Sequence, residues 1–146
     1  MTQQGFRILG ALSPLFVLAI LAIPGAYVEA LVDWLNRFLS LNIQGPSLAV
    51  GWQDKLVHAM LFFAMAYCVV RANYFPDYSL LWLLPPLLAY AAFTEGVQYF
   101  VPRRVPSTLD FLADAAGVCA GMACACWWAG SGINRPVSEP GTNYLR

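Results

Sequence analysis

The chain has 146 residues, of which 60% are hydrophobic and 11% charged, and its mean hydropathy is +0.60. This composition excludes an ordinary soluble globular protein and indicates an integral membrane protein with one domain. Eight basic and eight acidic residues give a formal net charge of zero, so no overall field attracts nucleic acid or an acidic partner. The four cysteines lie in apolar runs without zinc-motif spacing, and we expect them to be packing residues without disulfides.

Four apolar runs predict an all-α integral membrane bundle of four transmembrane helices. The first run is preceded by Arg7 and ends at Pro24-Gly25. A cleaved signal peptide is the other interpretation of this run, but no small-residue cleavage site follows it. The third run contains Pro85-Pro86, which we expect to interrupt its hydrogen-bond ladder and bend it. The predicted spans cover residues 8–23, 52–71, 80–100 and 109–128.

Two segments outside these spans have a different pattern. Between the first two spans, apolar residues such as Trp34 and Phe38 recur at helical spacing, and polar residues such as Asp33 and Arg37 fill the other face. This pattern predicts an amphipathic helix in the membrane interface over residues 27–41, unless the first helix simply continues beyond a kink at Pro24. The Gly-, Pro-, Ser- and Asn-rich residues 130–146 are predicted to be a disordered tail, which leaves residues 1–129 as the transmembrane domain.

Most polar residues of the predicted spans fall near three helix ends that must meet at one membrane face, because successive connections alternate sides. An ionised side chain at bilayer depth costs on the order of 2.5–3.5 kcal/mol, so a buried cluster of such residues indicates a functional site. Residues spaced three or four apart share a helix face, which is the spacing of each pair in this cluster. These pairs are Asp54 with His58, Glu95 with Gln98, and Asp110 with Asp114. After Asp114 the same stripe continues with small residues, Gly117, Gly121 and Ala125, which predicts that the fourth helix packs closely with this face inward.

The orientation of the bundle follows less directly from the sequence. Basic residues are equally divided between the two sides, so the positive-inside rule alone favours neither arrangement. When Lys55, Arg103 and Arg104 are discounted as members of the cluster, the rest favour a cytoplasmic N-terminus. The polar cluster would then lie on the outer face of the membrane.

Residues 50–125 contain four motifs in a fixed order, Asp54-Lys55-Leu56-Val57-His58, Glu95-Gly96-Val97-Gln98, Arg103-Arg104 and Asp110-Phe111-Leu112-Ala113-Asp114. This ordered set resembles the VanZ-like family of small bacterial membrane proteins. Asp114 departs from the pattern, because Asn is common in the family before the glycine. The resemblance implies a multi-pass protein of the bacterial cytoplasmic (inner) membrane, associated with envelope chemistry and with glycopeptide (teicoplanin) resistance.

The residues of the cluster allow several roles. His58, the single histidine, lies one turn from Asp54, which would orient its ring, and the other interpretation is a hydrogen bond that tethers helices. Glu95 is a candidate general acid or base unless Arg103 or Lys55 holds it in a structural ion pair. Arg103 and Arg104 either contact lipid headgroups in general or bind the phosphate of a lipid carrier. The acidic residues would suit a hard cation such as Mg²⁺, but we assign no metal and no cofactor from the sequence.

Two functional hypotheses follow. In the first, the protein binds an anionic lipid or a polyprenyl-phosphate-linked precursor, with substrate-binding residues Asp54, Lys55, Gln98, Arg103, Arg104 and Asp114. In the second, it is an intramembrane hydrolase or transferase with His58, Glu95 and Asp110 as catalytic residues. A purely structural scaffold is a third interpretation. The partners that we expect are membrane lipids, and the sequence does not define an oligomeric state.

Overall fold

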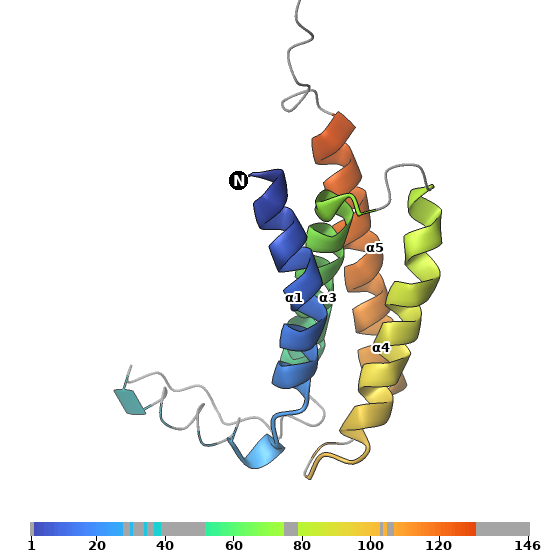
Figure 1. The fold of residues 1–146 in the computed structure, drawn as a ribbon. Helices are drawn as coiled ribbons and strands as arrows, with labels where there is room; N and C mark the ends of the chain where they lie inside the picture. The colour runs from blue at the N-terminus through green and yellow to red at the C-terminus, as the bar shows by residue number, and fades with distance from the viewer. Residues whose placement is uncertain are drawn as a thin grey trace, which may run out of the picture.

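The structure is a computed structural model that describes residues 2–27, 30, 34, 37–38, 52–74, 79–102, 104 and 107–130. The described part is all-α and contains four helices long and apolar enough to cross a membrane. The elements are α1 (Gln3–Leu21), α3 (Trp52–Ala72), the 3-10 helix η1 (Leu80–Leu83), α4 (Leu84–Gln98) and α5 (Thr108–Gly130), and Figure 1 shows the four long helices side by side. The prediction of a multi-pass helical membrane protein is confirmed.

Most of the predicted interfacial helix and of the tail lies outside the described residues. Trp34 and Phe38 are described, and both are exposed with their rings stacked at 5.3 Å between centroids. These two residues do not test whether a helix lies in the interface. Residues 131–146, which form nearly all of the predicted tail, are not described.

The helix boundaries follow from local chemistry. Thr2 caps α1, because its side-chain oxygen accepts a hydrogen bond from the backbone N–H of Gly5. Asn73 follows the last residue of α3 with a φ of 47°, a left-handed conformation that asparagine tolerates better than most residues. These caps set the length of the helices at one end of the bundle.

The two prolines of the third span lie earlier in their helix than the sequence interpretation assumed. Pro85 and Pro86 occupy the first turn of α4, and η1 precedes them. Proline has no backbone N–H, but the first turn of a helix has no intrahelical acceptors for its N–H groups. The prolines therefore start α4 after the 3-10 segment, and they do not bend the interior of a continuous helix.

The closest packing in the bundle is between α3 and α5. A Cβ atom at Gly117 would collide with the backbone carbonyl of Ala59, and one at Gly121 would collide with that of Phe63. The predicted small-residue stripe therefore brings the two backbones together. Helix α1 packs on α3, while α4 packs mainly on α5. The apolar core between these helices is formed by Val17, Leu21, Phe62, Met65, Ala66, Leu87, Ala91, Val118 and Met122.

The first residues of α1 are fixed to the end of α3. The Gln3 side chain donates hydrogen bonds to the carbonyls of Arg71 and Ala72, at 3.2 and 2.8 Å. The Arg71 guanidinium lies 5.1 Å from the centre of the Phe6 ring, within the range of a cation–π contact. This end of the bundle is therefore closed between α1 and α3.

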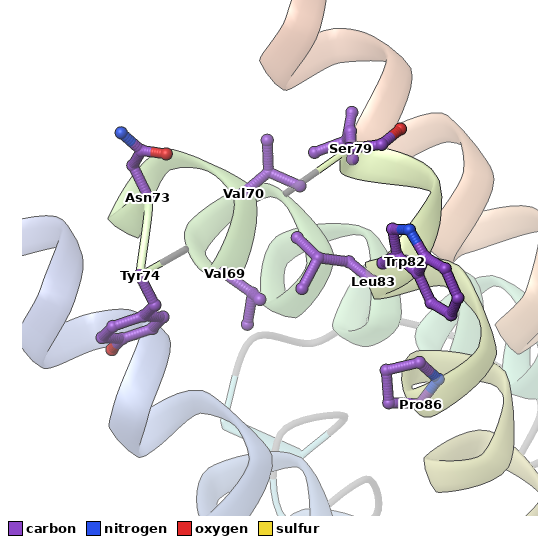
Figure 2. A pocket seen from close by; sticks show the side chains of 9 residues that line it. Val69, Val70, Asn73, Tyr74, Ser79, Trp82, Leu83 and Pro86 are labelled. Carbon is purple, nitrogen blue, oxygen red and sulfur yellow. The ribbon is translucent and has the colours of Figure 1, made fainter. Parts of the chain in front are cut away.

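Helix α4 is less tightly packed near the same end. A cavity of about 390 Å³ lies between the last turns of α3 and the start of the third span. Figure 2 shows Val69 and Val70 on one side of it, with Trp82, Leu83 and Pro86 on the other. The side chains of Asn73 and Ser79 lie at its rim, so its lining is mainly apolar with a polar edge.

Substitution of Gly117 by alanine tests the close approach of α3 and α5. The added methyl group would force the helices apart, and we expect the free energy of unfolding to fall by about 1–3 kcal/mol. Gly96→Ala is the matched control, because a Cβ atom at Gly96 has no neighbour within 4 Å. Unfolding in detergent with increasing sodium dodecyl sulfate, followed by circular dichroism, measures both. Equal effects of the two substitutions would contradict the packing described here.

Candidate functional site

The start of α3, the end of α4 and the start of α5 meet at one end of the bundle, as Figure 1 shows. The structure brings together eight of the nine predicted site residues, and the ninth, Arg103, lies outside the described residues. We call these eight the polar cluster: Asp54, Lys55, His58, Glu95, Gln98, Arg104, Asp110 and Asp114.

The centre of the polar cluster is His58, which is fully buried. Its Nδ1 atom lies 3.0 Å from an oxygen of Asp114 and 3.7 Å from an oxygen of Glu95. Its Nε2 atom lies 3.5 Å from the side-chain amide nitrogen of Gln98. One imidazole therefore connects three helices, since His58 is on α3, Asp114 on α5, and Glu95 and Gln98 on α4.

The predicted partner of His58 was wrong. The sequence interpretation expected Asp54, one helical turn away, to orient the ring, but Asp54 pairs with Arg104 at 3.3 Å. Asp114 contacts the ring instead because the close approach of α3 and α5 places it beside His58. The residue that departs from the family pattern thus lies at the centre of the cluster.

Two further ion pairs surround this centre on the side nearer the membrane face. Lys55 Nζ lies 2.6 Å from Asp110 Oδ1, with Asp110 buried. Arg104, in addition to its contact with Asp54, donates from Nε to the carbonyl of Ile23 at 3.5 Å. The Lys55–Asp110 pair joins α3 to α5. Arg104, in the segment after α4, contacts Asp54 on α3 and Ile23 just after the end of α1, and so joins these two helices.

Two buried carboxylate groups are only partly satisfied. Glu95 accepts a hydrogen bond from the Ser107 backbone N–H at 3.3 Å through Oε2, while its Oε1 atom has no hydrogen-bond partner among the described residues. Oδ2 of Asp114 also has no hydrogen-bond partner in the part of the chain that the structure describes, although the residue is fully buried. Buried polar atoms normally have such partners, because losing water without replacement is costly.

An open groove of about 640 Å³ reaches the polar cluster from the outside of the bundle, between α4 and α5. Glu95 is the only acidic residue of the cluster that lines it. The sequence does not predict this groove, because its shape depends on how α4 and α5 pack against each other. The groove is lined by Ala92, Glu95, Gly96, Tyr99, Ser107, Thr108 and Phe111.

Ser107 has a structural role at this end. Its hydroxyl accepts a hydrogen bond from the backbone N–H of Leu109 at 3.2 Å, and its carbonyl accepts one from Asp110 at 2.9 Å. These contacts stabilise the first turn of α5 as a helix cap. Its backbone N–H also contacts Glu95, so the same residue connects the start of α5 to the groove.

The polar cluster contains two sets of side chains with spacing suitable for a metal ion. One set is Asp54, His58 and Asp110, and the other is His58, Glu95 and Asp114, with the ligand atoms of each set within 4.8 Å of one another. In the first set both carboxylates already contact a basic side chain. In the second set, the carboxylates of Glu95 and Asp114 both lie beside the His58 imidazole.

Removal of the Lys55 ammonium group should leave Asp110 as a buried charge without its partner. We expect Lys55→Met to lower the free energy of unfolding by up to about 3 kcal/mol. This loss is smaller than the largest losses caused by breaking a fully buried ion pair, because the Lys55 side chain is 26% exposed. The double variant with Asp110→Asn should recover most of the loss, since the remaining amide carries no charge. Sodium dodecyl sulfate unfolding curves of the unsubstituted protein, the two single variants and the double variant would show this recovery, and additive losses would contradict a direct ion pair.

Comparison with known proteins agrees with this description. No curated protein and no solved structure matches the chain. A model of the VanZ/LLP1 family matches residues 8–129, which include α1 as well as the polar cluster. The match is therefore longer than the resemblance seen in residues 50–125, and it covers most of the 146 residues. The chain belongs to the VanZ/LLP1 family.

Proposed function

We propose that this protein, in the bacterial cytoplasmic membrane, binds a phosphate-containing anionic lipid or lipid-linked envelope precursor at the polar cluster. The observation that carries the proposal is the groove between α4 and α5, which connects the membrane-facing surface to Glu95. A ligand that enters there needs an apolar body and a polar head. Membrane lipids have both.

The walls of the groove suit such a molecule. Phe111 and Ala92 offer apolar surface to a lipid chain. Tyr99, just after the end of α4, is a residue type enriched where hydrocarbon meets headgroups. Ser107 and Thr108 are at the same end of the groove, at the start of α5. The groove therefore crosses the level at which a lipid headgroup is expected.

Cationic groups near the groove can contribute to binding a phosphate. Lys55 has three N–H donors and Arg104 has five, and the ion pairs with Asp110 and Asp54 leave some of these donors available. The pairing also cancels much of their charge, so they contribute hydrogen bonds more than net attraction. Replacing Arg104 would additionally disturb its contacts to α1 and α3, which makes it a poor test of lipid binding alone.

Filling the groove provides a cleaner test. Gly96→Leu places a side chain in the groove without a collision inside the bundle, and we expect it to reduce retention of phosphatidylglycerol and undecaprenyl phosphate in native mass spectrometry. The matched control is Ala120→Leu, which introduces the same side chain at an exposed position of α5 that does not line the groove. If Gly96→Leu and Ala120→Leu retain these lipids equally, the groove is not the binding site.

A second candidate function is supported by the centre of the cluster. His58, held by Asp114, lies beside Glu95, and Glu95 is accessible from the groove. Such an arrangement suits proton transfer to or from a group bound in the groove. In this candidate the protein is an intramembrane hydrolase or transferase acting on the phosphate-containing lipid.

Glu95→Gln distinguishes the two candidates. The amide retains the size of the side chain but cannot transfer a proton, so we expect loss of any lipid of altered mass while the unchanged lipid is still retained. Native mass spectrometry followed by lipid analysis measures both. Asp110→Asn is the comparison variant, because Asp110 pairs with Lys55 and does not line the groove. An altered lipid that persists in Glu95→Gln would remove Glu95 from the chemistry.

A further inference from the structure

The charges of the polar cluster do not balance among the described residues. Four carboxylates, of Asp54, Glu95, Asp110 and Asp114, face Lys55, Arg104 and His58. Lys55 and Arg104 each neutralise one acid. Among the residues that the structure describes, the remaining two acids, Glu95 and Asp114, share only His58, and both are buried where uncompensated charge is costly.

The unsatisfied atoms lie where the charge is in excess. Oε1 of Glu95 and Oδ2 of Asp114 are both buried without a hydrogen-bond partner, and each belongs to a carboxylate beside the His58 ring. Asp114 is fully buried. A cation bound by Glu95 Oε1 and by both carboxylate oxygens of Asp114 would satisfy these atoms and add positive charge where the described residues supply one imidazole for two acids.

The distances are those of ligands that share one ion. Two ligands at about 2.0–2.2 Å from a metal, with an angle of roughly 90–115° between them, lie about 2.8–3.7 Å apart. The separations from His58 Nδ1 are 3.0 Å to Asp114 and 3.7 Å to Glu95, which span this range. The groove at Glu95 provides a path by which an ion could enter.

We propose that His58 Nδ1 and the carboxylates of Glu95 and Asp114 form a binding site for a divalent transition-metal ion. The two carboxylates are ligands that suit Mn²⁺, and the imidazole suits Zn²⁺, which also binds carboxylate oxygens. When Nδ1 binds the ion, the ring proton lies on Nε2 and needs an acceptor. A half-turn of the Gln98 amide places its oxygen within 3.5 Å of Nε2, so Gln98 is the positioning residue for the ring.

The metal site also explains how an acidic cluster can bind an anionic lipid. The ion would lie next to the groove, beside Glu95, where a phosphate oxygen can complete its coordination. This bridging role rests on the proposed lipid-binding function, whereas binding of the ion itself does not.

Metal binding is tested on the full chain in nanodiscs of phosphatidylcholine, treated with EDTA and then dialysed. We expect titration with MnCl₂, followed by electron paramagnetic resonance of unbound Mn²⁺, to show one bound ion per chain that ZnCl₂ displaces. Bound Mn²⁺ in the unsubstituted protein should also show nitrogen coupling from one imidazole. Absence of stoichiometric binding of either ion, or bound Mn²⁺ without nitrogen coupling, would overturn the proposal without any variant.

Variants locate the site. Glu95→Gln and Asp114→Asn should each weaken Mn²⁺ binding by at least about 10-fold, and His58→Gln should abolish the nitrogen coupling. Asp54→Asn and Asp110→Asn, which change the other possible ligand set, should weaken Mn²⁺ binding less than Glu95→Gln and Asp114→Asn do. Circular dichroism and thermal melting confirm that each variant is folded. Loss of Mn²⁺ binding in Asp54→Asn and Asp110→Asn, with no loss in Glu95→Gln, would overturn this choice of ligands.

A lipid measurement separates the two proposals. Phosphatidylglycerol retention in native mass spectrometry is compared with MnCl₂ and with EDTA. Mn²⁺ binding without lipid retention under either condition would overturn the lipid-binding function and leave the metal site standing. Lipid retention in EDTA by a protein that binds no Mn²⁺ or Zn²⁺ would overturn the metal site and leave the lipid-binding function standing.

Discussion

The close approach of α3 and α5 at Gly117 and Gly121 determines the geometry of the polar cluster. With no side chain at these two positions, the backbone of α5 lies against that of α3, and the polar residues that precede Ala59 on α3 and Gly117 on α5 face each other across a short distance. His58 therefore contacts Asp114, and Lys55 contacts Asp110, at 3.0 and 2.6 Å. A larger separation of the helices would leave the same side chains unpaired in a region where unpaired charge is costly. The close packing of α3 against α5 and the pairing of these charged side chains thus both follow from the glycines at positions 117 and 121.

The polar cluster is difficult to explain as a stabilising element alone. Buried ion pairs contribute little net stability, because removing two charges from water costs about as much as their attraction returns. Lys55–Asp110 and Arg104–Asp54 lie near the membrane face, where they join α1, α3 and α5 at modest cost. Glu95 and Asp114 are different, because each has a buried oxygen that no hydrogen bond from the described residues satisfies. Their placement is better explained by binding or chemistry than by stability.

Much of the fold could be predicted from the sequence because membrane helices leave a strong record in hydropathy. Four apolar runs of sufficient length, joined by connections that alternate sides, indicate which helix ends must meet. The partner of His58 could not be predicted in the same way. Spacing within one helix shows that Asp54 and His58 share a face, but only the register between two helices shows that Asp114 is nearer. The position of the prolines in α4 and the groove at Glu95 also depend on contacts between helices, which hydropathy does not encode.

Helix α4 depends on the polar cluster for its position more than α3 and α5 do. At its end, Glu95 contacts the Ser107 N–H and Gln98 contacts His58, and in its middle the Tyr90 hydroxyl donates to the carbonyl of Pro14. At its start, the 3-10 segment and a cavity separate it from α3 (Figure 2). A cation or headgroup bound at Glu95 would change the contacts that hold one end of a helix whose other end is loosely packed. The element that carries the accessible acid is therefore also the one best able to adjust to a ligand, while α3 and α5 keep His58 and Asp114 in place.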